Sequence, residues 1–342
     1  MLLLRDAQPG DLPGLLALAR VLDSVNLPHD RKALAAILAR STGSFRGTIR
    51  DPLRRHYLFV LEDPRRRRIL GTSMLIAQHG THASPCTFFE LSEREHYSST
   101  LDRHFRHRVL SLGYHFDGPT EIGGLVVRPR ARGGPERPGR QLSLVRFLYL
   151  AAHRRDFRDT VLAELMPPLA PDGRSLFWES CGRRFTGLDY QTADKLSREN
   201  KEFIQQLFPP GGLYATLLPP RVQKLLGAVG PATRGAERLL SRIGFRFVGR
   251  IDPFDGGPHY ECRTDEVLQV REHRRLTVAR GEPGPGAGEK LVGAAGGGRV
   301  RFRAVRTPAA VSASGEELRL PAAARALLGV RPGDAVDAVP FA

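Results

Sequence analysis

The sequence has little cysteine and no long apolar run. Its three cysteines, Cys86, Cys181 and Cys262, are odd in number, far apart and in no CxxC pair, which argues against a disulfide framework or a zinc site and predicts no metal. No stretch approaches the roughly eighteen apolar residues that a membrane span needs. The first residues, MLLLRDAQPGDLPGL, place Arg5 and Asp6 directly after a short apolar run, which is not typical of a signal peptide. These features predict a cytoplasmic protein with no membrane partner.

Lysine is also scarce. Only five of the 52 basic residues are lysine, yet the formal net charge is +16, so the chain is rich in arginine. Such a charge attracts nucleic acid, anionic membranes or phosphorylated cofactors alike, and it does not choose among them. The 342 residues, 41% of them apolar, predict one main folded domain with an appendage.

Apolar periodicity predicts alternating strands and helices, and hence an α/β (α+β) fold with a mixed sheet. Asp11 is expected to cap the first helix, and residues 78–118 are expected to be irregular with one or more short strands. Trp178 and Phe177 are expected to be core residues. The predicted domains are a large α/β domain at 1–278, a Gly/Ala/Pro-rich linker at 279–298 and a small β-rich subdomain at 299–342.

Residues 122–152, IGGLVVRPRARGGPERPGRQLSLVRFLYLAA, place a basic glycine-rich loop between a predicted strand and a predicted helix. A helix N-terminus offers unpaired N–H groups, glycines let the backbone approach phosphate oxygens, and arginines add charge-assisted contacts. The pattern fits the diphosphate of an acyl-coenzyme A. A plain connecting loop is the alternative, and neither a Walker GxxxxGK[ST] nor a Rossmann GxGxxG motif occurs.

Other stretches resemble the arginine N-succinyltransferase family, which has the GCN5-related N-acetyltransferase fold. The specific ones are DGRSLFWESCGRRFTGLDYQTADKLS (172–197) and GFRFVGRIDPFDGGPHYEC (244–262). The resemblance implies transfer of a succinyl group from succinyl-CoA, a co-substrate rather than a permanently bound cofactor, to the α-amine of L-arginine. It also implies a homo-oligomer or a paralogous partner subunit.

The resemblance places coenzyme A on the strand and loop just described. The residues expected to bind it are Leu125, Val126, Val127, Arg132, Gly133, Gly134, Gly139, Arg140 and Gln141. An arginine substrate needs carboxylates for its guanidinium group. The candidates are Asp252, Asp255 and Glu261, of which Asp255 could equally be a turn former.

Two positions depart from the family pattern. The catalytic histidine of the family's VHPQT motif corresponds to Gly230 in VGPAT, and the arginine of AEMRG corresponds to Met166. A general base must therefore come from elsewhere. The candidates are Glu121, His115 and His259, each of which could instead be a solvated residue with no catalytic role.

Three alternatives to arginine succinylation stay open. The chain could be a non-catalytic CoA-binding partner subunit, because it lacks the family histidine. It could act on ornithine or another amine of similar shape. Nucleic-acid binding is disfavoured, although the tail LPAAARALLGVRPGDAV resembles AbrB-like DNA-binding domains, because a shared small β fold does not carry function with it.

Overall fold

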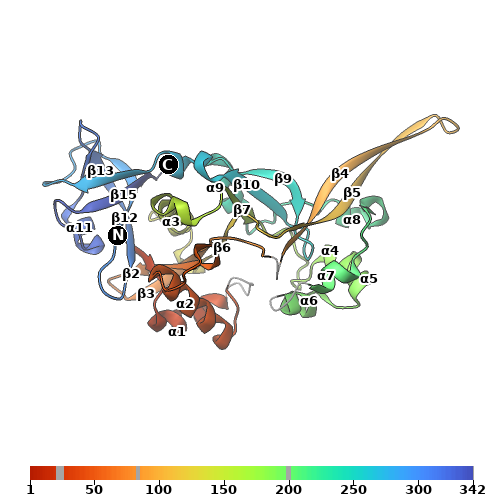
Figure 1. Ribbon diagram of the computed structural model, residues 1–342, viewed down its shortest axis with the longest axis horizontal. Coiled ribbons are helices and arrows are strands. Elements are labelled where there is room, and N and C mark those ends of the chain that lie inside the picture. Colours follow the sequence, from red (N-terminus) through yellow and green to blue (C-terminus); the bar gives the residue numbers. More distant parts are fainter. Residues whose placement is uncertain (21–26, 82–84, 198–201, 342) are drawn as a thin grey trace. The chain divides into compact units, whose positions relative to one another are not determined.

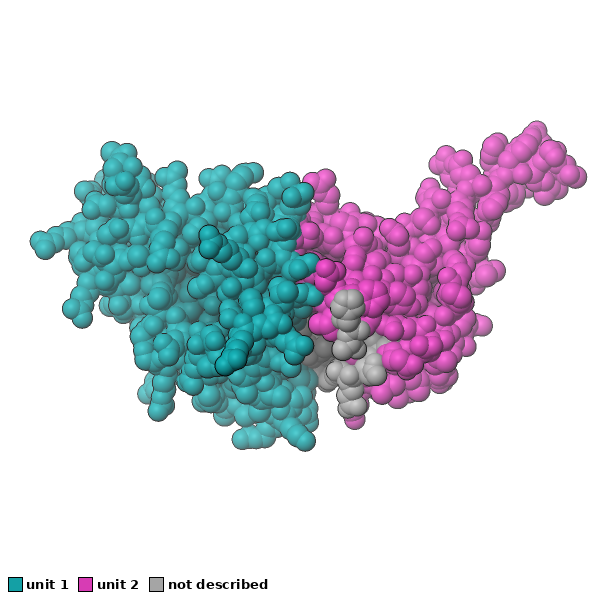
Figure 2. Space-filling model, in the orientation of Figure 1, with its two compact units in different colours: residues 1–78, 120–159, 263–342 teal, residues 79–119, 160–262 magenta. Residues whose placement is uncertain are grey.

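The computed structural model describes residues 1–20, 27–81, 85–197 and 202–341, and the chain divides into two compact units. Unit 1 comprises residues 1–78, 120–159 and 263–342, and unit 2 comprises residues 79–119 and 160–262 (Figure 2). Each unit is therefore assembled from segments that are distant in sequence.

Unit 1 is built on strands in the order β12-β15-β11-β14-β13-β1-β2-β3-β6. An additional β12–β13 pairing closes five of these strands, β11 to β15, on themselves. The strands are β1 Leu3–Asp6, β2 His56–Asp63, β3 Arg68–Ile76, β6 Thr120–Val127, β11 Arg274–Val278, β12 Gly288–Ala295, β13 Phe302–Val311, β14 Glu317–Arg319 and β15 Ala335–Pro340. The helices are α1 Leu12–Ala19, α2 Arg31–Phe45, α3 Pro138–Ala152, α10 Leu268–Arg271 and α11 Ala322–Leu328 (Figure 1).

Unit 2 has strands in the order β7-β10-β9-β4-β5-β8. These are β7 Thr160–Glu164, β10 Pro258–Arg263, β9 Arg246–Ile251, β4 Cys86–Ser98, β5 Arg103–His115 and β8 Leu213–Tyr214. Short helices accompany them: α4 Leu176–Ser180, α5 Gly182–Thr186, α6 Tyr190–Ser197, α7 Glu202–Leu207, α8 Pro220–Gln223 and α9 Arg234–Arg242. The mixed α/β fold predicted from the sequence is confirmed.

Trp178 and Phe177 are core residues of unit 2, as predicted. Both are almost completely buried, and the Trp178 indole stacks on Phe254 with ring centroids 5.1 Å apart. The indole N–H donates to the Leu188 carbonyl at 2.9 Å, so its one polar group is satisfied within this core.

The expectation of irregular structure at 78–118 is wrong. Strands β4 and β5 form a hairpin of two 13-residue strands that projects from the rest of unit 2 (Figure 1). Its outer part carries charges on both strands, with Glu93 opposite Arg108 and Glu95 opposite Arg106. Because both faces are solvated there, the sequence lacks the apolar alternation by which strands are recognised.

The linker predicted at 279–298 is also not a linker throughout. Gly288–Ala295 form β12, which pairs with β13 on one side and β15 on the other. Gly293 of this strand packs closely on α3. A Cβ atom at Gly293 would lie 2.9 Å from Leu148 Cδ2. A glycine that suggested a linker by composition is needed here for the close approach of β12 to α3.

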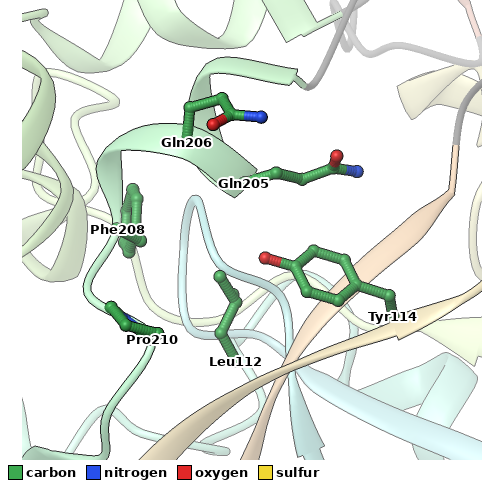
Figure 3. Close-up of a pocket in the computed structure, with 6 residues that line it drawn as sticks. All are labelled: Leu112, Tyr114, Gln205, Gln206, Phe208 and Pro210. Atoms are coloured by element: carbon green, nitrogen blue, oxygen red, sulfur yellow. The ribbon is translucent and has the colours of Figure 1, made fainter.

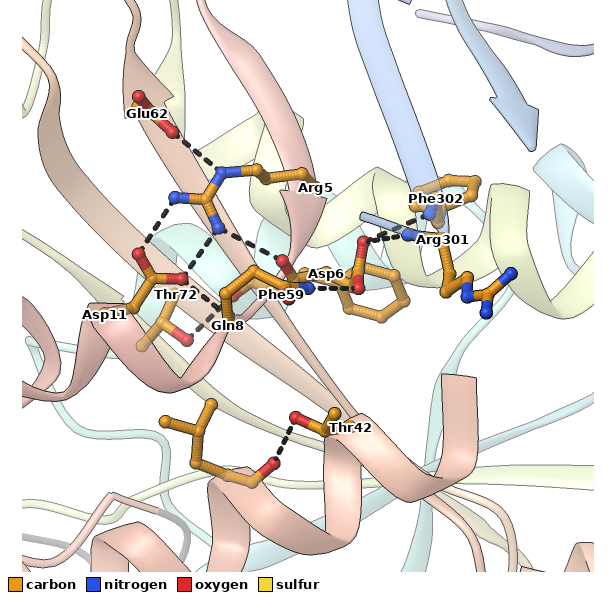
Figure 4. Close-up of polar contacts among 11 residues, drawn as sticks. Arg5, Asp6, Gln8, Asp11, Thr42, Phe59, Glu62, Thr72, Arg301 and Phe302 are labelled. Atoms are coloured by element: carbon orange, nitrogen blue, oxygen red, sulfur yellow. Dashed lines mark hydrogen bonds and ion pairs between the residues drawn. The ribbon is translucent and has the colours of Figure 1, made fainter. Parts of the chain in front are cut away.

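A buried polar network joins the N-terminal strand to the C-terminal segment of unit 1 (Figure 4). The Asp6 carboxylate accepts the backbone N–H groups of Arg301 and Phe302 at 2.9 and 3.0 Å. Asp11 does not cap α1 with its side chain. Its carboxylate instead accepts the Arg5 guanidinium, which also donates to Glu62. Burial raises the pKa of Asp6, although the two amides oppose that shift.

Replacing Asp6 with alanine should destabilise the protein by about 2–4 kcal/mol, because two backbone amides at the start of β13 would lose a charged acceptor. Equilibrium urea unfolding measures the loss. The exposed Asp51, which caps a single turn at Leu53, is the matched control, and Asp51→Ala should cost roughly 0.5–1 kcal/mol. A loss below that of the control would show that water satisfies these amides.

The raised pKa of Asp6 also predicts a pH dependence. The folded state holds the Asp6 proton more tightly than the unfolded chain, so this residue's contribution to stability is full below pH 3.8 and is lost as pH rises through the folded-state pKa. The loss is at most about 1.4 kcal/mol per pH unit. In Asp6→Asn the contribution is absent, so unfolding free energies of the two proteins should diverge as pH rises from 3.8. Parallel curves would contradict the assignment.

Candidate functional site

Strand β6 is interrupted by a bulge near its end. Its register with β3 shifts between the pairs Thr72↔Val126 and Met74↔Gly123, so β6 carries one extra residue there. Gly124 has φ +58°, a left-handed conformation that glycine adopts readily. Bulges turn backbone groups out of the ladder and often lie beside active sites. The bulge includes Leu125, which is only partly buried.

The predicted phosphate loop follows β6 and ends at the N-terminus of α3. Arg137, with φ +48°, is the N-cap residue and Pro138 opens the helix. Gly133 also has a left-handed φ of +73°, and a Cβ atom there would meet nothing within 4 Å, so this backbone faces open space. The partial positive charge at the N-terminus of this 15-residue helix favours phosphate. Pro138 has no N–H group, and the N–H groups of Arg140 and Gln141 donate to the Arg137 carbonyl, so the candidate backbone donors are Gly139 and the loop before the helix.

Two arginines of the loop are held by backbone carbonyls. Arg128 Nε donates to the Ile69 carbonyl at 2.7 Å, and Arg132 Nε donates to the Val127 carbonyl at 3.1 Å. Burial, and then the charge of Arg68, lower the pKa of Arg128. Each guanidinium is thus anchored through Nε at the start of the loop.

The other residues expected to bind coenzyme A differ in accessibility. Gly134 and Gly139 lie along the loop and the first turn of α3, and Arg140 lies with its guanidinium 5.2 Å from the centre of the Phe341 ring. Val126 and Val127 are buried. Gln141 is fully buried and donates to the Glu136 carbonyl at 2.6 Å, so its side chain fixes the loop rather than facing solvent.

The three candidate bases lie in different surroundings. Glu121 is buried on β6, opposite Ile76 of β3, in the same unit as the phosphate loop. His115, at the end of β5, has its Nε2 atom 3.0 Å from Arg250 Nη1. Since a guanidinium can only donate, this contact uses the lone pair of Nε2. Burial, followed by the charge of Arg250, lowers the pKa of His115, so the imidazole is neutral at pH 7.

The carboxylates expected to hold an arginine substrate are engaged within unit 2. Glu261 lies 3.3 Å from Arg250, and burial raises its pKa. Asp252 accepts the N–H groups of Phe254 and Asp255, and Asp255 accepts that of Gly257. Burial and the charge of Asp252 raise the pKa of Asp255 well above its usual range. Asp252 and Asp255 are therefore the turn formers that the DGG pattern allows.

His259 lies beside a carboxylate that the sequence did not indicate. Its Nε2 atom is 3.5 Å from Oε1 of Glu164, the last residue of β7. The imidazole is almost completely buried, whereas the Glu164 side chain is 32% exposed. Glu164 was missed because it stands alone at the end of an apolar strand, DTVLAEL.

Glu164 also belongs to a group of possible metal ligands. Donor atoms of His79, Cys86 and Glu164 all lie within 4.8 Å of one another. The three residues come from the segment before β4, from the first residue of β4 and from the end of β7. Their spacing in the sequence follows no metal-binding motif, so only the fold brings them together.

Gly230 occupies a position without room for a side chain. Its N–H donates to the Met166 carbonyl at 2.9 Å. A Cβ atom at this position would lie 2.6 Å from the Pro167 carbonyl oxygen and 2.8 Å from that of Met166. The backbone at Gly230 therefore packs directly against the segment that follows β7.

Unit 2 also contains a cavity of about 430 Å³ between β5 and the segment around α7 (Figure 3). Its lining offers amide and phenol groups but no charge, and no sequence motif indicated it. The lining residues are Leu112, Tyr114, Gln205, Gln206, Phe208 and Pro210.

Comparison with known proteins assigns the family. A family model described as arginine N-succinyltransferase beta subunit matches residues 2–269, and a model of its C-terminal domain matches residues 274–340. The chain belongs to the arginine N-succinyltransferase family.

Individual members of this family cover nearly the whole chain. An arginine N-succinyltransferase of Enterobacter sp. (strain 638) is 34% identical over 289 residues, which is 84% of this chain and 83% of the relative. One from Yersinia pseudotuberculosis serotype O:3 (strain YPIII) is 34% identical over 81% of this chain and 79% of its own. The structure of arginine/ornithine succinyltransferase subunit AI from Pseudomonas aeruginosa superposes with a TM-score of 0.84 and 29% identity, over 100% of this chain and 99% of that one.

The family resemblance inferred from the sequence is thereby confirmed. Among the described residues, no helix has both the length and the apolar character to cross a membrane. The packing at Gly230 has a physical consequence for any side chain placed there.

Restoring a side chain at Gly230 should destabilise this family member. Gly230→Ala should cost about 1–3 kcal/mol, because its Cβ would overlap the Pro167 carbonyl, and Gly230→His should cost at least as much. The matched control is Gly235→Ala in α9, where a Cβ atom meets nothing within 4 Å and alanine favours the helix. Thermal unfolding compares the variants. Equal stability of Gly230→His and wild type would mean that this loop opens readily to accept the imidazole.

Proposed function

We propose that the protein transfers the succinyl group of succinyl-CoA to the α-amine of L-arginine. The amine nitrogen attacks the thioester carbonyl carbon, the carbon–sulfur bond breaks, and the products are N2-succinyl-L-arginine and coenzyme A. The observation that carries the proposal is the match of the whole chain to arginine N-succinyltransferases, because it extends over both family models and the complete solved subunit.

Unit 1 supplies the proposed coenzyme A site. The diphosphate would lie at the N-terminus of α3, against the open backbone at Gly133 and Gly134 and the anchored guanidinium of Arg132. A backbone amide at the β6 bulge, near Leu125, would donate to the thioester oxygen as negative charge develops there. Both features are built from backbone atoms of one strand–loop–helix segment, so their spacing is fixed by the fold.

We assign Glu121 as the general base that takes the proton of the amine. This carboxylate lies on β6, the strand that carries the bulge, so it belongs to the same rigid element as the proposed acyl site. His115 is a poorer base because Arg250 occupies the lone pair of its Nε2 atom. His259 lies on β10, next to Glu164 of β7, and not on the strand that carries the bulge.

A second candidate function is that of a CoA-binding partner subunit without turnover of its own. Gly230 favours it, because a Cβ atom would lie 2.6 Å from the Pro167 carbonyl oxygen at the position where the sequence resemblance expects the family histidine. The solved relative is named a subunit, and the matching family model is described as a beta subunit, so we also propose that this chain works in an oligomer, with itself or with a paralogous chain.

A thiol-release assay on the purified chain tests the two functions. Succinyl-CoA and acetyl-CoA are crossed with arginine, ornithine and lysine. The proposed activity requires release that depends on succinyl-CoA and arginine together. Thiol release that requires ornithine would mean that ornithine, not arginine, is the acceptor amine. Binding of coenzyme A without thiol release from any pair would favour the partner-subunit function.

Glu121→Gln tests the assigned base. The substitution keeps the size of the side chain and should lower kcat by about 10²- to 10⁴-fold, while the Kd for coenzyme A is unchanged. Glu316→Gln, in a turn of the C-terminal barrel, is the control and should leave both quantities at the wild-type values. If kcat is unchanged in Glu121→Gln but falls in His115→Gln or His259→Gln, that histidine is the general base instead.

A further inference from the structure

We propose that His79, Cys86 and Glu164 form a site for a borderline-soft divalent cation, Zn²⁺ by preference. Their donor atoms, an imidazole nitrogen, a thiol sulfur and a carboxylate oxygen, all lie within 4.8 Å of one another in unit 2. Zinc bonds to such ligands are about 2.0–2.3 Å long, so small side-chain rotations suffice to bring all three onto one ion. The site is independent of the acyl transfer proposed above.

The backbone holds the first two ligands in place. The His79 N–H donates to the Pro119 carbonyl at 2.7 Å, and Cys86 pairs with His115 in the β4–β5 ladder. Between them Gly80 has φ +83°, and a Cβ atom there would lie 2.7 Å from the Cys86 nitrogen. Only glycine fits at this position, where the backbone beside His79 lies close to the start of β4.

The third ligand is oriented by its surroundings. Glu164 ends β7, and the N–H of the next residue, Leu165, donates to the Pro258 carbonyl at 3.1 Å. The neighbouring His259 then places its Nε2 atom 3.5 Å from the Glu164 carboxylate. This is an ion-pair distance rather than a hydrogen bond, and with an ion bound His259 would close onto the carboxylate as the second polar group that commonly holds such a ligand.

The ligand set selects the ion. A thiolate disfavours Mg²⁺ and Ca²⁺, which prefer oxygen, whereas Zn²⁺ accepts sulfur, nitrogen and oxygen together. Cys86 is 2% exposed, so the ion would bind at the edge of the interior, and the partly exposed Glu164 gives it a route from solvent. Three protein ligands leave a fourth position for water or another small ligand. On binding, the Cys86 thiol gives its proton to solvent.

Cys181 is a buried cysteine of the same unit that is not part of the proposed site. It lies in the apolar core around Trp178, where burial raises the pKa of its thiol to about 12. A thiol in that environment is a poor metal ligand. Cys181→Ala is therefore the matched control for Cys86→Ala, since both remove one buried sulfur from unit 2.

The test uses the full chain after removal of metal with a chelator and gel filtration. Zn²⁺ is titrated against a chromophoric chelator, and Co²⁺ is titrated in parallel by absorption spectroscopy. We expect one Zn²⁺ per chain and a thiolate-to-cobalt charge-transfer band in the near ultraviolet. Cys86→Ala should lose the band and bind Zn²⁺ more than about 100-fold more weakly, and His259→Gln should lose about 10- to 100-fold.

Two controls keep the result interpretable. Cys181→Ala and His104→Ala, the latter an exposed hairpin histidine, should bind as the wild type does, and circular dichroism confirms that every variant is folded. Absence of the cobalt band in the wild type, or equal Zn²⁺ affinity in folded Cys86→Ala, overturns the proposal. Because the readouts are binding and absorption, neither outcome depends on whether the protein is an active succinyltransferase.

Discussion

Unit 1 depends on the pairing of strand β1 on both of its edges. β1 is antiparallel to β2 on one side and to β13 on the other, and Asp6 at its end accepts two amides from the start of β13. The strand thereby joins the closed five-stranded C-terminal barrel to the sheet that ends in β6. The other contacts of the barrel with the rest of the unit include those with α3, with the loop before it and with Phe59 of β2.

The barrel in turn supports the proposed phosphate loop. Gly293 of β12 lies against Leu148 of α3, and Phe302 packs edge-on against Tyr149 with ring centroids 5.2 Å apart. Arg306 of β13 donates to the Pro135 carbonyl inside the loop, and Phe341 has the guanidinium groups of Arg140 and Arg306 within 5.2 Å of its centre. The C-terminal subdomain therefore stabilises α3 and the loop that precedes it.

The sequence predicted best where one local pattern determines the structure. The strand–loop–helix around Gly133, the core position of Trp178 and the DGG turn each follow from a few adjacent residues. The β4–β5 hairpin was missed because its outer faces are both polar, and β12 because close packing favours the small residues that also compose linkers. The group of His79, Cys86 and Glu164 could not be predicted, since the three ligands come from separate segments and no spacing rule relates them.

Several arginines of this chain donate to backbone carbonyls of the same unit. Arg303 donates to the Leu327 carbonyl, and Arg325 donates to the carbonyls of Gly281 and Leu320, all within the C-terminal barrel. Arg128 and Arg132 likewise donate to carbonyls beside the loop. A guanidinium has five donors in a planar fork, so one side chain can hold a backbone carbonyl and still reach a second partner, which an ammonium does less well. These four guanidinium groups have fewer donors left for phosphates, so they contribute less to binding a nucleic acid than their share of the formal charge of +16 suggests.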